Sequence, residues 1–569
     1  MMTSKRIRFS AAVCGTLAAA ATLTMLGSAA SPTFYDDDPI WVERDTQDAS
    51  SMKPLEVDLV VDLGYNIIKG ADNIVNVRAQ NVNTVDDVPD SSWFTNRVGR
   101  RPLTPEDVAK GPDTSDGPAS GTWTVTSSKS DGVTPGFTIK DANGQRWFLK
   151  FDPPGLSGMS TGTEVAVTKL MWALGYHVPE NHVAYMRREQ LVVGDGAKFT
   201  PPGGKPRAMR LGDIDALLQR ADHERDGSYR IVASKGLPGK PIGRVRFYDT
   251  RPDDPNDIVP HEHRRELRGY GVFAAWLNHV DAKAINSLDM LVTENGRSFV
   301  RHNLIDFGSS LGSAGVGPAE HWEGSQYLVE TDEMVKQMVG FGFVFPKWHT
   351  TKFYEAPSIG RLLLDNTTFN PDLWKPRVPN RAFLHARADD KFWAAQRLMA
   401  LTTDMLRAAV SAGDFRDPAS EAFLVNALRE RRDAIGRAYL TAINPIADPA
   451  LDEDGTLTFR NAAVDADFAR APEGYRAIWS RFDNATGTSE RIGESSARTT
   501  RLEAPAGLPA TPGSFIKVEL ASMGASHASY SSWQTPVDAY FRLGDGGWHL
   551  VGFERMPAHE ISHTAIGTR

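Results

Sequence analysis

The stretch from Asn278 to Gly308 constrains the fold of this chain more than any other. Residues 288–292 alternate like a strand, residues 294–297 form a turn sequence, and residues 299–305 alternate again. The turn contains an Asn-Gly pair, which is a strong hairpin signal because both central residues of a type I′ turn need positive φ. The sequence therefore predicts a β-hairpin that returns an Asp-Phe-Gly triplet, beginning at Asp306, to the loop that precedes the first strand.

Four polar side chains flank this predicted hairpin. Asp281, Lys283 and Asn286 lie in the loop before it, and Asp306 follows it. Carboxylate and amide oxygens are ligands that Mg²⁺ prefers, and a lysine meets phosphate as a point charge. We expect Asn286 and Asp306 to bind magnesium, Asp281 to orient or deprotonate an acceptor hydroxyl, and Lys283 to steady the transferred phosphate.

A second group of candidate residues lies upstream. Three short strand-like runs are separated by turn residues: Trp123–Ser127, Gly136–Lys140 and Arg146–Phe151. Lys150 lies near the end of the third run and can meet the phosphates of ATP. Thr163 opens a helical pattern that stops at Gly175. Glu164 falls in the predicted first turn, where it can pair with Lys150 and hold it extended.

The order of these parts resembles the protein-kinase-like superfamily. A strand lysine and a helix glutamate are followed by His-x-Asp-x-Lys-x-x-Asn, from His279 to Asn286, and then by a hairpin and Asp-Phe-Gly. The resemblance covers about residues 122–445. It implies ATP and Mg²⁺ as cofactors and assigns catalysis and metal binding to Asp281, Asn286 and Asp306.

Several departures indicate an atypical branch of that superfamily. No Gly-x-Gly-x-x-Gly joins the first two strands, where Gly132 and Gly136 are only a loose substitute. Val280 replaces the arginine of the catalytic loop, so activation through a phosphorylated loop paired with that arginine is not expected. The helix pattern after Thr163, with the Val178-Pro179 turn beyond it, is similar to HipA-type serine kinases and lipid-kinase relatives.

The remaining sequence supports an α+β, two-lobed protein-kinase-like fold with an N-terminal extension and a small C-terminal β-domain. Residues 31–121 form the extension and linker, in which Val57 to Leu63 reads as a strand. The N-lobe spans about 122–189 and the C-lobe about 263–445, with 190–262 as an insertion or an extended connection. Helical patterns are expected before the hairpin and in the later C-lobe: His263–Asn278, Thr331–Gly340 and Ala388–Ile443. Residues 452–569 carry short alternating runs typical of a β-sandwich or barrel.

The first thirty residues read as a signal peptide. Lys5, Arg6 and Arg8 precede an apolar run, and small residues follow at 28–30. We expect export to the periplasm, cell envelope or medium, with no membrane insertion beyond this segment. The only cysteine, Cys14, lies inside it, so a cleaved chain has neither disulfides nor thiol catalysis. A net charge of −8 argues against nucleic acid as a partner.

Three functions remain open on this sequence. The first is an exported phosphotransferase that acts on a hydroxyl of a protein or an envelope glycan. The second is a pseudokinase that serves as a binding or scaffold protein, favoured by the missing glycine loop and by the scarcity of ATP outside the cytoplasm. Transfer of the nucleotide instead of the phosphoryl group is the third.

Two stretches of the sequence contain histidines that could bind metal or accept protons, residues 261–263 and His279. His261-Glu262-His263 fits neither His-Glu-x-x-His nor a Cys/His zinc pattern, and we expect a solvated segment that opens a helix. His279 is expected to pack under the catalytic loop and not to act as a base.

Overall fold

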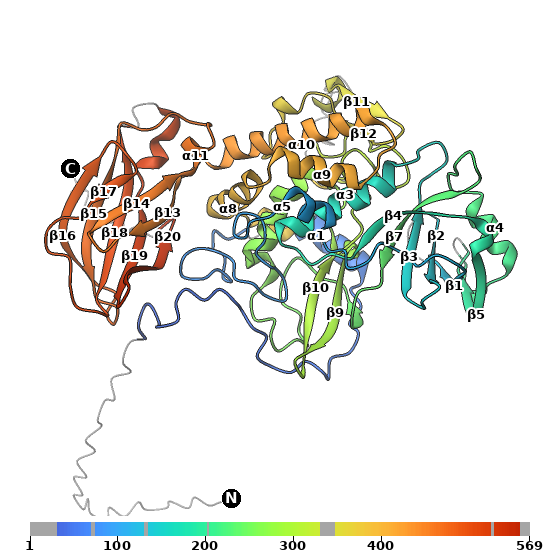
Figure 1. The fold of residues 1–569 in the computed structure, drawn as a ribbon, viewed down its shortest axis with the longest axis horizontal. Helices are drawn as coiled ribbons and strands as arrows, with labels where there is room; N and C mark the ends of the chain where they lie inside the picture. Colours follow the sequence, from blue (N-terminus) through green and yellow to red (C-terminus); the bar gives the residue numbers. More distant parts are fainter. Residues whose placement is uncertain are drawn as a thin grey trace, which may run out of the picture.

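The computed structural model describes residues 31–69, 74–129, 135–201, 204–330, 347–524 and 528–557. The expected signal peptide, Gly132 and the expected helix from Thr331 to Gly340 lie outside these ranges. Within them, no helix is both long and apolar enough to cross a membrane. The chain forms a mixed α/β structure with several separate sheets (Figure 1).

The first sheet has seven strands in the order β4-β7-β3-β2-β1-β5-β6. Its strands are β1 (Trp123–Ser128), β2 (Gly136–Lys140), β3 (Arg146–Phe151), β4 (Asn181–Met186), β5 (Leu191–Phe199), β6 (Arg207–Ala208) and β7 (Tyr229–Lys235). The three strands predicted between residues 123 and 151 are confirmed. The interpretation of 190–262 as an insertion is wrong, because β7 pairs with both β3 and β4 inside this sheet. Pairing of strands distant in sequence leaves no local pattern to detect.

Helix α3 (Met159–Leu174) packs against this sheet and begins earlier than predicted. Asp152 explains the difference, since its carboxylate accepts backbone N–H bonds from Gly158, Ser160 and Thr161 at 2.8–3.0 Å. Such bonds satisfy donors that are otherwise unpaired at a helix start. Glu164 consequently lies in the second turn, and not the first. The helix ends before Gly175, whose φ of 122° suits a glycine.

The hairpin is formed by β9 (Ser287–Glu294) and β10 (Arg297–Leu304), joined in one sheet by β8 (Lys240–Gly243). The strands are antiparallel and pair without a bulge from Arg297↔Glu294 to Leu304↔Ser287. Asn295 and Gly296 have φ values of 51° and 78°, as a type I′ turn requires. The predicted hairpin is therefore confirmed.

Helices dominate the middle of the molecule (Figure 1). They are α5 (Arg265–Leu277), α7 (Arg381–Leu384), α8 (Ala388–Met399), α9 (Thr403–Ala412) and α10 (Pro418–Tyr439). Helix α4 (Leu211–Leu218) lies against β5, and β11 (Phe353–Ala356) and β12 (Gly360–Leu363) form a two-stranded sheet. The helical pattern from Ala388 to Ile443 is confirmed as three helices. Side chains from α3, α5, α8, α9 and α10 share one hydrophobic cluster.

The N-terminal segment packs directly on this cluster. Trp93 stacks on the His302 ring at 3.4 Å between centroids, and Phe94 is fully buried. The predicted strand at 57–63 is wrong, because α1 (Leu59–Lys69) covers that stretch; α2 (Pro105–Lys110) follows. In α1, Asp62 and Asn66 are buried while Val60 is 79% exposed, so the helix presents its polar side to the protein. Its β-branched residues favour a strand, and the buried i, i+4 polar pair offers no apolar signal for a helix.

A buried charge network joins the N-terminal segment, α5 and α8. Arg265 has no exposed surface and contacts Asp86, Asp389 and Asp390 at 2.9–3.1 Å. Burial lowers the pKa of Arg265, but the three carboxylates outweigh burial and raise it above its ordinary value. The charged forms of these buried side chains are therefore stable only while each side chain keeps its ion-pair partners.

Arg265→Ala is expected to lower the free energy of unfolding by about 3–5 kcal/mol, because it leaves buried carboxylates without a cation. Urea unfolding at neutral pH measures the change. Arg407→Ala is the matched control: its pair with Asp404 is more than half exposed, so a loss of about 1 kcal/mol or less is expected. Equal losses in the two variants would contradict a structural role for the network.

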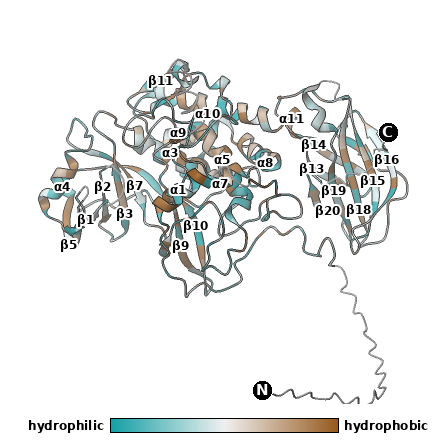
Figure 2. Ribbon diagram, turned by 180° about the vertical axis from the view of Figure 1, so that it is seen from behind, coloured by the Kyte–Doolittle hydropathy of each residue, from teal (hydrophilic) through white to brown (hydrophobic). Residues whose placement is uncertain are grey.

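Two sheets form the C-terminal part of the chain, drawn in orange and red in Figure 1. One sheet has the order β13-β14-β17 and the other β16-β15-β18-β19-β20. Their strands are β13 (Ile446–Leu451), β14 (Thr456–Asn461), β15 (Gly474–Phe482), β16 (Ser489–Ala497), β17 (Arg501–Glu503), β18 (Phe515–Met523), β19 (Val537–Gly544) and β20 (Gly547–Glu554), with α11 (Ala462–Asp465) after β14. Buried side chains of both sheets share one cluster that includes Trp479 and Phe541. Figure 2 shows strands in which brown apolar segments adjoin teal polar ones.

Candidate active site

Lys150 is the link between the predicted upstream and downstream residues. It projects from β3, and its Nζ lies 3.2 Å from Glu164 Oε2 and 2.9 Å from Asp306 Oδ1. Burial lowers the pKa of Lys150, but the charges of Asp306 and Glu164 outweigh burial and raise it above its ordinary value. The structure thus brings together three residues that are up to 156 positions apart in the sequence, counted from Lys150 to Asp306.

Glu164 ties α3 to the Asp-Phe-Gly triplet. Its side chain is 2% exposed, and Oε1 accepts the Phe307 backbone N–H at 3.0 Å while Oε2 faces Lys150. The glycine of the triplet packs closely against α3: a Cβ on Gly308 would lie 3.1 Å from Ser160 Oγ and 3.3 Å from Glu164 Oε2, so a larger residue would displace these side chains. Glu164 therefore fixes both the lysine and the backbone that carries Asp306.

Asp306 has a left-handed backbone, with φ of 61°, which aspartate tolerates better than most residues. Burial raises the pKa of its carboxyl, but the charge and hydrogen bond of Lys150 outweigh burial, and the pKa is lowered. The side chain nonetheless keeps 42% of its surface exposed. An ionised and accessible carboxylate is what a metal ligand requires.

The loop before the hairpin brings the other three predicted residues together. Lys283 Nζ lies 2.8 Å from Asp281 Oδ1. Asn286 Nδ2 donates to the backbone oxygen of Asp281 at 2.7 Å and to its Oδ2 at 2.9 Å. Ile305 N–H donates to the Asn286 backbone oxygen at 3.0 Å, so the end of β10 is bound to this loop. The predicted convergence of loop and triplet is thus present.

The donor set fits a hard divalent cation. Both protons of the Asn286 amide are directed at Asp281, and its Oδ1 accepts no hydrogen bond from any described residue. This neutral oxygen and the Asp306 carboxylate are oxygen ligands of the type that Mg²⁺ takes, with water and phosphate oxygens completing its shell. Asn286 and Asp306 would hold the ion.

Two further residues at this site carried no signal in the sequence. Arg377 Nη1 lies 3.4 Å from Asp281 Oδ1, and its backbone N–H donates to the Val280 oxygen at 2.8 Å. Arg377 Nε also pairs with the buried carboxylate of Glu323. Asp281 is therefore flanked by the cations of Lys283 and Arg377. Arg377 is 96 positions from Asp281 in the sequence, and no motif connects the two.

His279 packs beneath the loop that carries Asp281, as predicted. Its ring lies 5.6 Å from that of Phe307, and Nδ1 lies 2.9 Å from Ser310 Oγ. Burial lowers the pKa of His279 to about 4, against the opposing charges of Asp281 and Asp306. The imidazole is therefore neutral at physiological pH, and so low a pKa makes it a weak proton acceptor.

His279→Gln tests this burial through pH. The native pKa of His279 lies below the ordinary value of 6.5. Between these two values the unfolded chain binds a proton at His279 and the native chain does not. The wild type should lose about 3 kcal/mol of unfolding free energy at this residue as pH falls from about 6.5 to 4. Urea unfolding at several pH values should show a shallower loss in the variant. An unchanged slope would contradict the buried neutral state.

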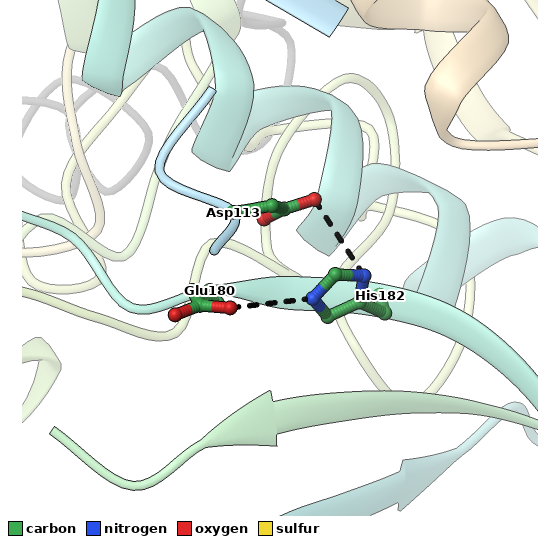
Figure 3. A group of neighbouring side chains, drawn as sticks. All are labelled: Asp113, Glu180 and His182. Carbon is green, nitrogen blue, oxygen red and sulfur yellow. Dashed lines mark ion pairs between the residues drawn. The ribbon is translucent and has the colours of Figure 1, made fainter. Parts of the chain in front are cut away.

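One further polar group in the described part of the chain has donor atoms close enough together to hold a metal ion. Asp113, Glu180 and His182 lie together near the start of β4 (Figure 3). However, Lys169 pairs with Asp113, and Lys235 lies 2.8 Å from Glu180, so lysines already neutralise both carboxylates.

The expectation of a solvated His261-Glu262-His263 segment is wrong. It forms a 3₁₀ turn before α5 with His261 3% exposed, and Asp257 Oδ2 lies 2.7 Å from its Nε2. Tertiary packing and not the local sequence buries this polar stretch.

Comparisons with known proteins supply little. No protein-family model matches the chain, and no curated protein matches it. Among solved structures, the chain is similar to the Helicobacter pylori proinflammatory kinase CtkA, at 14% identity over 55% of this chain and 95% of that one, with a TM-score of 0.28. It is also similar to the Golgi casein kinase, at 10% identity over 71% of this chain and 96% of that one, with a TM-score of 0.30. A structure of the Golgi casein kinase with Mn/ADP bound gives 10% identity over 70% of this chain and 95% of that one, with a TM-score of 0.28. Matches with TM-scores this low do not establish a function for the chain.

Proposed function

We propose that this chain is an exported, ATP- and magnesium-dependent phosphotransferase of the atypical protein-kinase-like kind. Its acceptor is a hydroxyl on a protein or an envelope glycan. The observation that carries the proposal is the bridge from Lys150 to both Glu164 and Asp306, beside the Asp281–Asn286 loop. A lysine held between two carboxylates on separate elements, next to oxygen ligands, suits the polyphosphate of a nucleotide.

Each residue of the proposed site would have a role that suits the chemistry of its side chain. Lys150 would contact the α- and β-phosphates, with Glu164 holding it extended. When bound, magnesium supplies positive charge that neutralises the phosphate oxygens. Asp281 would orient the acceptor hydroxyl and take its proton, and Lys283 would contact the transferred phosphate.

One observation favours a second candidate, a pseudokinase that binds partners without catalysis. Asp306 Oδ1 already contacts Lys150 at 2.9 Å, so a metal must compete with an existing ion pair for that oxygen. The loose glycine pattern between the first two strands points the same way. Retention of Asp281, Lys283 and Asn286 in one hydrogen-bonded group favours the phosphotransferase.

Measurements of ATP binding and of label transfer from ATP distinguish the two candidate functions. Residues 31–569 with ATP and Mg²⁺ should show a raised Tm, equivalent to about 2.7 kcal/mol at a hundredfold excess over Kd. The absence of a shift would refute the nucleotide site. Transfer of label from γ-labelled ATP to acceptor indicates a phosphotransferase, and transfer from α-labelled ATP indicates nucleotide transfer. Binding without either transfer indicates a pseudokinase.

A further inference from the structure

A cavity of about 700 Å³ lies where the N-terminal segment, α8 and the C-terminal sheets meet. Residues from 38–41, 85–87, 392–396, 447–452 and 548–550 contribute to its wall. Neither Lys150 nor Asp306 lines it, so it is separate from the candidate active site. Its volume falls in the range of small-molecule and cofactor sites.

Two indole rings contribute to the wall of this cavity. Trp41 is 40% exposed, and the guanidinium of Arg100 lies 4.9 Å from the centre of its ring. Trp548 is partly buried and packs against the C-terminal hydrophobic cluster while it also lines the cavity. Both rings are thus anchored by protein contacts and retain surface for a ligand.

The arginines that line the cavity are already paired within the protein. Arg100 contacts the carboxylate of Asp87, and Arg542 Nη1 lies 3.1 Å from Asp36 Oδ1. Arg555 Nη1 donates to two backbone oxygens at 2.8 and 2.9 Å. Each lining arginine therefore already has a partner within the protein, and an anionic ligand would have to displace one of these contacts.

Most lining carboxylates are paired as well. Asp86 and Asp389 lie 2.9 and 3.1 Å from the guanidinium of Arg265, and Asp448 lies 3.3 Å from that of Arg460. The cavity therefore offers unpaired charge mainly at two carboxylates: the exposed Asp452, and Asp38, which accepts only the Tyr35 backbone N–H among the described residues. An uncharged ligand suits this environment best.

Unused hydrogen-bonding capacity remains beside the two indoles. The side chains of Gln396 and His549 line the cavity and make no hydrogen bond to any described residue. An amide and an imidazole each donate and accept, as the hydroxyls of a sugar do. Aromatic faces suit the C–H faces of a pyranose ring, and the polar side chains suit its edges.

We propose that this cavity binds a neutral oligosaccharide, with Trp41 and Trp548 as stacking platforms and Gln396 and His549 as hydrogen-bonding residues. The N-terminal segment and the C-terminal sheets, which flank the proposed active-site residues in the sequence, would both contact a glycan of the cell envelope. This binding needs no phosphoryl transfer, and its test is independent of the proposed activity.

Isothermal titration of residues 31–569 with β-1,4-linked N-acetylglucosamine tetramer, cellotetraose and maltotetraose tests the site. At least one should bind with a Kd in the millimolar range or tighter and change the tryptophan fluorescence. Trp41→Ala and Trp548→Ala should each weaken that binding about tenfold, from the loss of one aromatic contact. Phe148→Ala, which removes a ring that is 42% exposed elsewhere, should leave it unchanged. Asp306→Asn should also leave it unchanged.

Two results would overturn this proposal. One is no heat from any of the three sugars at about 10 mM, above the millimolar Kd of weak complexes. The other is binding that does not depend on the proposed contacts, seen either as wild-type affinity in both tryptophan variants with unchanged Tm or as a neutral peptide of similar size that binds as tightly as the sugar. Lost sugar binding with a retained ATP shift refutes the glycan site alone, and the reverse result refutes the nucleotide site alone.

Discussion

Asp281→Asn should lower the rate of phosphoryl transfer by about 10²–10⁴-fold, the contribution typical of a positioned acid or base. The asparagine keeps the shape of the side chain but cannot accept the proton of the hydroxyl. It also loses the charge that Lys283 and Arg377 contact at 2.8 and 3.4 Å. Because Asp281 makes no contact with Lys150, the Tm shift with ATP and magnesium should remain.

Initial rates of label transfer from γ-labelled ATP, together with Tm measurements, check this prediction. Glu294→Gln is the matched control, since it neutralises a carboxylate on the same hairpin that is 49% exposed and, among the described residues, pairs only with Arg301. Its rate should match the wild type. If Asp281→Asn retains the wild-type rate, Asp281 does not act on the acceptor. If it loses the ATP shift too, its effect extends beyond proton transfer.

Asp306→Asn should abolish the magnesium-dependent part of the ATP shift and reduce transfer at least as strongly as Asp281→Asn. Asparagine is a better replacement than alanine here, because it tolerates the φ of 61° and preserves the side-chain volume. The variant removes the negative charge from one of the two ligands that carry the metal proposal, and it frees Lys150 from one of its two carboxylates.

The Asp306→Asn measurement is the Tm with ATP alone, with magnesium alone and with both. A Tm close to the wild type without ligand would show that the fold is intact. A full magnesium-dependent shift in this variant would contradict Asp306 as a metal ligand. Lys150→Met separates the two effects, because it should weaken ATP binding while Asp306 and Asn286 remain to bind magnesium.

The predicted site residues came from short-range information and from the order of motifs. The turn at Asn295-Gly296 sets the register of the hairpin, and that register determines that Asp306 returns to the loop of Asp281. Each of these steps depends on residues that are close in sequence. The same reasoning failed where a side chain outside the helical pattern alters the end of a helix, as when Asp152 extends α3 toward its N-terminus.

The sequence by itself determined the hairpin, the first three strands, the helices after residue 388 and the identity of the six candidate site residues. The tertiary structure alone decided that β7 lies between β3 and β4, that Arg377 reaches Asp281, and that Arg265 is buried among three carboxylates. The physical reason is the range of the forces involved. Turn geometry and hydrophobic periodicity act between near neighbours, whereas sheet pairing and buried ion pairs join residues that only the folded chain brings into contact.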